Sequence, residues 1–238
     1  MKKFFVTLSA IAMMAPVFAQ EAEESVSFHQ VLKNEFIDGG PVFMAPIAMV
    51  LIFGMAFVIE RIIYLNLSDV NKKKLIDAVE DAMEAGNIEE ALDICKKTRG
   101  PIASIFTQAL IRLNDGQSLE DVDKAITSYG ALQSTYLEKN LSWITLFIAA
   151  APSLGFLGTA IGMVITFDDI VKAGDISPTI VAAGMKVALI TTIAGIIVAL
   201  MLQLFYNYLL SKVEDIVSDM EDASISLLDT IIKYDAKK

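Results

Sequence analysis

The chain has 238 residues, of which 55% are hydrophobic and 20% are charged, and its mean hydropathy is +0.56. So few charges exclude an ordinary soluble domain and an intrinsically disordered chain. Because 19 basic and 29 acidic residues give a net charge of −10, the chain lacks the basic surface that nucleic acid requires. One cysteine and one histidine exclude an internal disulfide, a Cys/His zinc site and a histidine-based catalytic triad. We therefore expect a membrane protein with aqueous parts, without enzyme activity, a cofactor or a metal.

The first apolar run, Phe4–Ala19, follows Lys2 and Lys3 and precedes an acidic segment. A basic start, a short apolar run and a small residue at its end predict a secretory signal peptide. An uncleaved anchor helix is the alternative, although 16 residues are few for a membrane span. In both cases the following segment starts outside the cytoplasm, and Ser27–Ile37 is expected to form a short amphipathic helix at the membrane surface.

Three longer runs without charged residues follow, at Gly39–Ile59, Asn140–Phe167 and Val187–Leu210. Each exceeds the about 20 helical residues that cross a hydrocarbon core of about 30 Å. The expected fold is therefore an all-α integral membrane protein with three transmembrane helices and long cytoplasmic helical extensions. Its predicted parts are a signal peptide (1–19), an external segment (20–40), a first transmembrane helix (41–65), a cytoplasmic helical domain (66–140), a second transmembrane helix (141–167), an external loop (168–178), a third transmembrane helix (179–210) and a cytoplasmic helical tail (211–238).

Lysine and arginine residues near the ends of the spans predict the orientation. Arg61 and Lys72–Lys74 follow the first span, whereas a single lysine precedes it in the mature chain. The positive-inside rule then places residues 66–140 and the C-terminal tail in the cytoplasm. The signal peptide independently predicts the same orientation, with the mature N-terminus on the periplasmic side of an inner membrane.

Helices are also predicted outside the spans. Apolar spacing and turn residues predict helices over Asp69–Ala85, over Ile88–Thr98 and in a third segment that ends at Asn114. Ser118 and Asp121 resemble a capping box, and we expect the helix that they open to continue unbroken into the second span. Apolar residues of the tail alternate by four and three, which predicts a helical seam: Leu209, Val213, Ile216, Met220, Ala223, Leu227 and Ile231. This seam packs either against the chain's own cytoplasmic helices or against another subunit.

Small residues form stripes on the second and third spans. Such residues let helix backbones approach closely in lipid, where the hydrophobic effect does not hold helices together. Ordinary helix packing explains any one of these positions, whereas two matched stripes favour several helices arranged in a ring around a common axis. The residues assigned to packing are Gly155, Gly158, Gly162, Ala188, Gly195 and Ala199.

Three threonines, Thr159, Thr191 and Thr192, lie deep in the second and third spans. Thr159 is nine positions from Asp168 and Thr192 is six from Lys186. These separations correspond to depths of about 13 Å and about 9 Å, which are compatible with one polar layer that lines a wet passage. A hydrogen bond to the preceding helical turn is the alternative explanation for each threonine alone.

No Asp, Glu or His lies in the central part of any predicted span. An ion or proton carrier normally has an ionisable group there, so a partner must supply the carboxylate if this protein helps to move protons. Glu60, Arg61 and Lys186 lie at span borders, where solvation and snorkelling explain them. We interpret Cys95 as a core residue.

Two segments of the spans resemble one known family. Ala151–Met163, APSLGFLGTAIGM, is similar to the signature of the second transmembrane helix of the MotA/TolQ/ExbB proton-channel family, and Gly184–Gly195 resembles its third. Ala91–Cys95 and Gly100–Ala103 resemble a cytoplasmic segment of ExbB, and the similarity covers residues 40–210. The chain departs from many ExbB and TolQ sequences at Val187, where they carry glutamate.

The resemblance implies an inner-membrane channel or stator subunit that forms a homopentamer around a dimer of an ExbD- or TolR-like single-span protein. The partner's membrane aspartate would take and release protons, and Thr159 and Thr192 would face it. Proton or sodium flow would then energise an outer-membrane system, such as TonB-dependent transport with a TonB-like protein. Two alternatives stay open: an oligomeric membrane scaffold that conducts nothing, and a TolQ- or MotA-like motor for envelope integrity or motility.

Overall fold

A computed structural model describes residues 28–69 and 72–236, and the predicted signal peptide at residues 1–19 lies outside the described residues. The described ranges form helices joined by short connections. In chain order they are α2 (Phe28–Asp38), α3 (Pro41–Ser68), α4 (Lys72–Glu84), α5 (Ile88–Lys97), α6 (Pro101–Asn114), α7 (Leu119–Glu138), α8 (Leu141–Ala173) and α9 (Pro178–Ala236).

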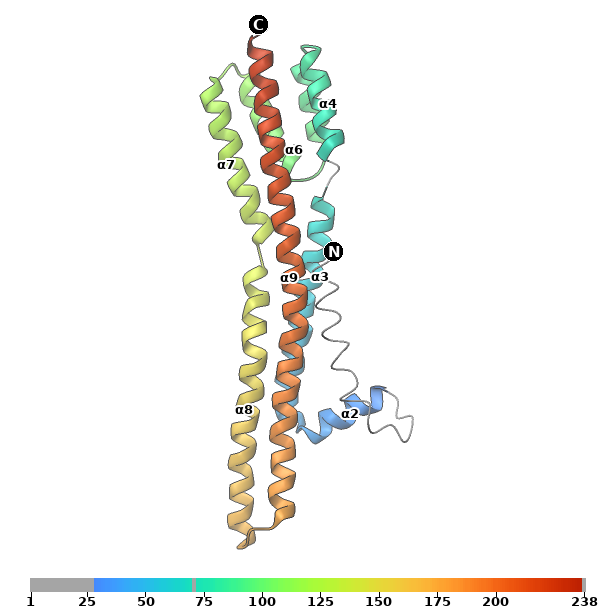
Figure 1. The fold of residues 1–238 in the computed structure, drawn as a ribbon, viewed down its shortest axis with the longest axis vertical. Coiled ribbons are helices and arrows are strands. Elements are labelled where there is room, and N and C mark those ends of the chain that lie inside the picture. Colours follow the sequence, from blue (N-terminus) through green and yellow to red (C-terminus); the bar gives the residue numbers. More distant parts are fainter. Residues whose placement is uncertain (1–27, 70–71, 237–238) are drawn as a thin grey trace.

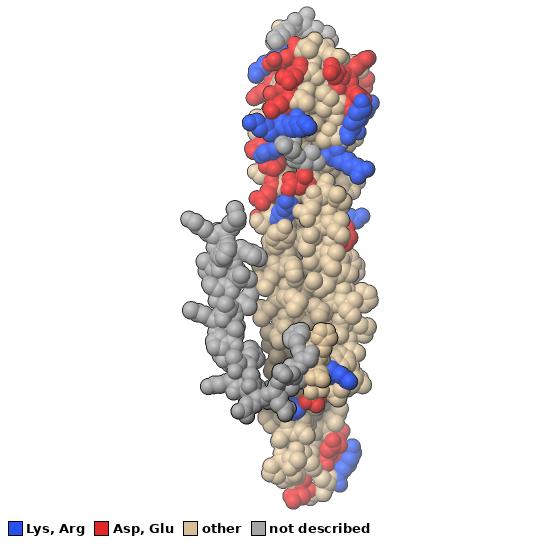
Figure 2. All heavy atoms as spheres, turned by 90° about the vertical axis from the view of Figure 1, so that its right-hand side faces the viewer, with Lys and Arg blue, Asp and Glu red and all other residues tan. Residues whose placement is uncertain are grey.

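The membrane part consists of α3, α8 and α9. Helix α9 runs antiparallel to α8 along the full length of α8, and α3 packs against both helices (Figure 1). The three predicted spans fall in three helical stretches that are long and apolar enough to cross a membrane. Figure 2 shows a broad band without charged side chains over this part and a cluster of Lys, Arg, Asp and Glu at the end that carries α4–α7.

Helices α4–α7 pack around the C-terminal half of α9, which is one continuous helix of 59 residues and about 90 Å (Figure 1). The predicted seam of α9, from Leu209 to Ile231, is buried at all seven positions. The interpretation that this seam packs within the chain is therefore confirmed. Ile105, Leu110 and Val122 are fully buried in the same core.

Local signals at helix ends agree with the structure. The Ser118 hydroxyl accepts a hydrogen bond from the backbone N–H of Asp121 at 3.2 Å, which is the N-cap that the sequence predicts. Asn87 caps α5 in the same way, through the N–H of Glu90 at 3.1 Å. These caps satisfy backbone donors that the first turn of a helix leaves without a partner.

Two boundaries differ from the sequence prediction. The prediction of an unbroken helix from α7 into the second span is wrong, because α7 ends at Glu138 and Asn140 takes a left-handed conformation with φ of 68° before α8 begins. Helix α8 also continues to Ala173, past the end of the predicted span at residue 167. The connection to α9 is correspondingly short and starts at Gly174, which has φ of 73°.

Candidate functional site

Helices α8 and α9 approach closely because glycines of each helix face the backbone of the other. A Cβ atom added at Gly155 would lie 2.8 Å from the carbonyl oxygen of Thr191. One added at Gly195 would lie 2.5 Å from the carbonyl oxygen of Ala151. Only hydrogen fits at these two positions, so the sequence brings the two backbones together here.

The other predicted packing residues lie at the same contact, and the space around them differs. A Cβ atom at Gly158 would lie 2.8 Å from the Thr191 hydroxyl, whereas one at Gly162 would lie 3.6 Å from Ala188 Cβ, an ordinary contact distance. Ala188 is buried, and Ala199 is half-buried against the core. The steric demand for glycine therefore falls along α8 from Gly155 towards Gly162.

The hydroxyl groups of Thr159, Thr191 and Thr192 come together at this contact. The Thr159 hydroxyl donates to the carbonyl of Ala188 at 2.8 Å and is hydrogen-bonded to the Thr192 hydroxyl. The Thr191 hydroxyl donates to the same carbonyl at 2.8 Å. The carbonyl of Gly155 lies 3.3–3.4 Å from all three hydroxyl oxygens.

The three threonines differ in exposure. Thr191 is fully buried between α8 and α9, whereas Thr159 and Thr192 are half-buried. The Thr159–Thr192 pair therefore lies at an open edge of the helix contact, where a group outside this chain can reach it. The short hydrogen bond of Thr191 is made within α9, to the carbonyl of the preceding turn, and its hydroxyl reaches the Gly155 carbonyl of α8 at 3.4 Å.

The charged pair at the end of the first span has a structural role that sequence reasoning missed. Arg61 is only 2% exposed, and its guanidinium donates to both carboxylate oxygens of Glu60 at 3.0 and 3.1 Å. It also donates to the carbonyl of Lys139 at 2.7 Å and contacts the ring of Tyr64 at 4.3 Å. Glu60 in turn accepts a hydrogen bond from the side chain of Asn140 at 3.3 Å. The pair thus fixes the end of α7 and the start of α8 against α3.

Lys186, the third charged residue predicted at a span border, lies at the opposite end of the membrane part. Its ammonium group pairs with Asp38 at 2.7 Å, which joins α9 to the end of α2. Both side chains are exposed, so this pair adds little stability on its own.

Cys95 and the acidic residues outside the spans give no indication of a metal centre. Cys95 is 1% exposed, and burial raises the pKa of its thiol to about 12, which keeps it protonated and unreactive. Among the described residues, no group of three or more His, Cys, Asp and Glu side chains is arranged to hold a metal ion.

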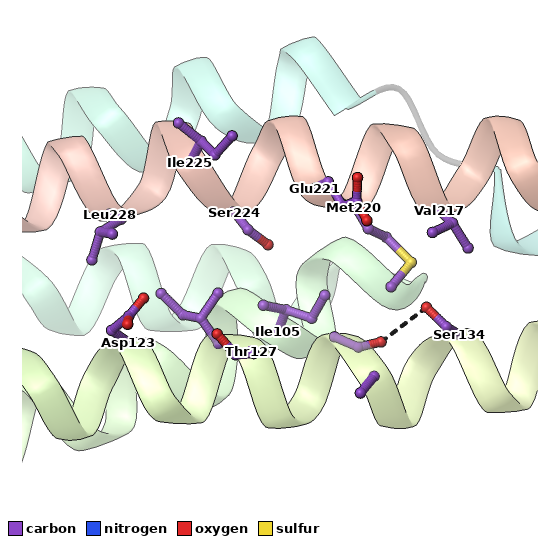
Figure 3. Close-up of a pocket in the computed structure, with 13 residues that line it drawn as sticks. Ile105, Asp123, Thr127, Ser134, Val217, Met220, Glu221, Ser224, Ile225 and Leu228 are labelled. Carbon is purple, nitrogen blue, oxygen red and sulfur yellow. Dashed lines mark hydrogen bonds between the residues drawn. The ribbon is translucent and has the colours of Figure 1, made fainter.

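A groove of about 530 Å³ lies between α6, α7 and α9 in the bundle (Figure 3). Its lining includes apolar side chains such as Ile105 and Met220. Figure 3 shows Asp123 and Thr127 on α7 across from Leu228 and Ser224 on α9. Within the described part of the chain, no basic side chain lines this groove, so these residues offer packing surface rather than a site for an anion.

The fold and the site define an integral membrane protein in which two helices, packed closely at glycines, present a pair of hydroxyls. Residues 97–222 match the model of the MotA/TolQ/ExbB proton channel family. The chain is 32% identical over 198 residues to a putative biopolymer transport protein ExbB homolog of Methanothermobacter thermautotrophicus, covering 82% of this chain and 69% of that protein. It is 28% identical over 184 residues to putative biopolymer transport protein ExbB-like 1 of Synechocystis sp., covering 76% and 71%.

A shorter match is 35% identical over 85 residues to biopolymer transport protein ExbB of Aquifex aeolicus, covering 36% of this chain and 57% of that protein. The chain belongs to the MotA/TolQ/ExbB proton channel family. The resemblance drawn from the residues of the second and third spans is therefore confirmed. The members that it matches are described as channel or transport components rather than enzymes.

Proposed function

We propose that this chain is the channel or stator subunit of an inner-membrane motor complex of the ExbB/TolQ type, driven by the proton-motive force. It assembles as a homopentamer around a dimer of an ExbD- or TolR-like single-span protein, and the complex energises outer-membrane transport with a TonB-like protein. Family membership supports the class of complex. The mature N-terminus lies in the periplasm and the C-terminus in the cytoplasm.

The observation that carries the proposal is the Thr159–Thr192 hydroxyl pair at the open edge of the contact between α8 and α9. A hydroxyl both donates and accepts hydrogen bonds, so it can solvate a carboxyl group in either protonation state. When Thr159 donates to the Ala188 carbonyl, the Thr192 hydroxyl donates to Thr159, and lone pairs of Thr192 remain for a protonated acid. Rotation of the Thr192 hydroxyl instead offers its proton to the ionised acid.

The acid itself must come from another chain. Uncharged sequence extends over the central part of every span, and the charges of Glu60 and Arg61 are used at the end of the first one. A hydroxyl pair without a titratable group transfers no net proton across a membrane by itself. A partner helix with one carboxyl group, moving past such hydroxyls, supplies the missing group.

The exposed apolar surface of the spans supports an oligomer. Only 17%, 22% and 33% of the residues in the most apolar windows of the three spanning stretches are buried within the chain. Large apolar side chains such as Phe156, Ile193 and Leu200 are more than half exposed. Neighbouring subunits, the partner helices and lipid together cover this surface in the proposed complex.

The proposal is tested by substituting the two threonines in the assembled complex. The chain is co-expressed with a single-span protein that has an aspartate at the start of its span, purified as a complex and reconstituted in vesicles with a pH-sensitive dye. Thr159→Val or Thr192→Val is expected to lower proton flux by about tenfold or more, because a hydrogen bond to a charged group contributes about 1.5–3 kcal/mol. The subunit stoichiometry, measured by native mass spectrometry, should stay unchanged.

Ser153→Ala is the matched control, because Ser153 lies on the same helix and its hydroxyl donates to the Ala149 carbonyl of its own turn at 2.9 Å. Proton flux should be normal in this variant. Normal flux in both threonine variants would contradict the proposal and favour the non-conducting scaffold. Full proton flux through the chain without its partner would contradict it as well.

A further inference from the structure

A polar cavity of about 240 Å³ lies where the end of α3, the start of α6 and the last turns of α7 meet. Its lining residues from α3 include Tyr64 and Ser68, and Arg99 lies in the connection before α6. Gln133 lines it from α7. This cavity is separate from the hydroxyl pair between α8 and α9 and takes no part in the proposed proton pathway.

Among the residues that the structure describes, Arg99 is the only charged one that lines the cavity. Among the described residues, no hydrogen bond or ion pair occupies its guanidinium, the amide of Gln133 or the hydroxyl of Tyr64. The cavity therefore combines one permanent positive charge with two neutral groups that can donate hydrogen bonds, and no acid opposes them. A guanidinium fork matches the oxygens of a phosphate group in geometry and charge.

The cavity lies at the depth of phospholipid headgroups. Arg61 closes the uncharged run of the first span, and Tyr64 and Ser68 follow it by about 5 Å and about 10 Å along α3. The interfacial layer on each side of the hydrocarbon core is about 5–8 Å thick, so a lipid phosphate lies at this level.

An exposed apolar strip on α3 leads from the span to this cavity. Ile59, Ile63 and Leu67 follow each other at intervals of four residues and are 52%, 55% and 67% exposed. Side chains at this spacing lie on one face of a helix. An acyl chain can therefore lie along α3 while the phosphate that it carries enters the cavity.

We propose that this cavity binds a phosphate group, and that the phosphate belongs to an anionic phospholipid of the leaflet on the Arg61 side. Arg99 is the charged ligand, and Tyr64 and Gln133 donate neutral hydrogen bonds. A bound lipid ties the connection between α5 and α6 to the bilayer surface. The site is built from α3, α6, α7 and the connection before α6, so a test of it is independent of the test of the proton pathway.

The test compares Arg99→Gln with Arg112→Gln in the purified full chain. Arg112 lies near the C-terminal end of α6, whereas Arg99 precedes its start, and Arg112 does not line the cavity, so it controls for the loss of one positive charge. Binding of dioleoylphosphatidylglycerol and of dioleoylphosphatidylcholine to the detergent-solubilised protein is measured by native mass spectrometry. We expect Arg99→Gln to weaken binding of the anionic lipid about tenfold, as for one lost charge-assisted hydrogen bond, and Arg112→Gln to bind as the unsubstituted chain does.

Two further measurements make the outcome decisive. Binding of inorganic phosphate, measured in place of lipid, identifies the molecule that carries the bound phosphate group. If Arg99→Gln weakens binding of inorganic phosphate only, the cavity is a phosphate site and the proposal that a lipid supplies the phosphate is overturned. Gln133→Leu should give a smaller loss of the anionic lipid, and circular dichroism checks that each variant is folded. Equal binding of both probes by Arg99→Gln and the unsubstituted chain would overturn the site.

Discussion

At the residue scale, the contact between α8 and α9 depends on positions where one methyl group has no space. The carbonyl of Ala151 belongs to a helix backbone that cannot turn away, and a Cβ atom at Gly195 would lie 2.5 Å from its oxygen. The neighbours of Gly162, in contrast, lie at ordinary van der Waals distance from a Cβ atom. The two glycines therefore look alike in sequence and differ in steric demand.

We expect Gly195→Ala to lower the free energy of unfolding by about 1–3 kcal/mol, because the added methyl group forces α8 and α9 apart. Gly162→Ala should change it by less than about 0.5 kcal/mol. Unfolding of the detergent-solubilised protein, followed by far-ultraviolet circular dichroism, measures both variants. Equal effects of the two substitutions would show that the helix contact is not limited by Gly195.

Sequence reasoning at this scale could place a side chain along a helix but not around its axis. The depths of Thr159 and Thr192 could be counted from the span ends, and the two hydroxyls do lie within hydrogen-bonding distance. The burial of Thr191 and the exposed edges of its two neighbours depend on how α8 and α9 are rotated against each other. That rotation is set by the packed glycines, so the sequence of one helix alone does not contain it.

At the scale of elements, the break between α7 and α8 is fixed by contacts from α3. Three carbonyl oxygens at the end of α7, those of Tyr136, Leu137 and Lys139, lie within 3.4 Å of Arg61 Nη1. Asn140 then reverses the sign of φ and hydrogen-bonds Glu60. No glycine or proline stands at this point, and the signal that the sequence does carry, Asn140 directly after Lys139, is a weaker mark of a helix end that the prediction did not use.

Asn140 itself provides the test of this break. Asn140→Val should destabilise the protein by about 1–2 kcal/mol, because a β-branched residue strains the left-handed conformation. Asn140→Gly should be close to neutral, since glycine adopts that conformation without strain. Hydrogen exchange of the last turn of α7 reports the local effect. Unchanged stability and hydrogen exchange in Asn140→Val would show that α7 and α8 are joined by a different backbone conformation.

Two lysines link the elements near the membrane border to α9. Lys72 of α4 pairs with Asp219, and Lys212 of α9 pairs with Asp69 beside the end of α3. The hydrogen bond that Lys72 donates to Asp219 raises the pKa of Lys72, and the one that Lys212 donates to Asp69 raises the pKa of Lys212. Both pairs are solvent-accessible, so their contribution is modest and is screened by salt.

The sign of the pH dependence follows from these raised pKa values. The stabilisation is fully present below the unfolded-state pKa of about 10.4 and is lost as the pH rises through the higher folded-state value. The pairs should therefore stabilise the protein equally throughout the neutral range, and the melting temperature should decline above about pH 10. The double variant Lys72→Met, Lys212→Met should lose part of that decline, whereas Lys124→Met, which removes an exposed pair with Glu120, should keep it. If the melting temperature of the double variant declines above about pH 10 as it does in the unsubstituted chain, other titrating groups cause the decline.

At the scale of the whole molecule, the sequence predicts the architecture well because the strongest signals are long. Uncharged runs of more than 20 residues leave no alternative to spanning helices, and the seam of α9 is long enough to define one buried face. The contact between the bundle and the spans could not be predicted from the lengths of these runs or the spacing of the seam. It depends on single residues, Arg61 above all, whose buried contacts come from segments about 75 residues apart in sequence.

The orientation in the membrane is the prediction that belongs to the whole molecule. Three spans place the start of α2 and the end of α9 on opposite sides, so α2 and the connection between α8 and α9 share one side, and the bundle of α4–α7 shares the other with the end of α9. The side of the bundle carries the cluster of charged residues that Figure 2 shows, and its lysines predict that it is cytoplasmic.

Single cysteines in a Cys95→Ala background decide the orientation, because Cys95 is the only cysteine and is buried. A membrane-impermeant maleimide on intact spheroplasts should label Gln30→Cys and Asp175→Cys, which stand at exposed positions on the side predicted to be external. Asp235→Cys, exposed near the end of α9, should react only after the membrane is permeabilised. Labelling of Asp235→Cys alone in intact spheroplasts would invert the orientation. The proton-motive force would then act on the hydroxyl pair from the opposite side, and the bundle could not contact cytoplasmic partners.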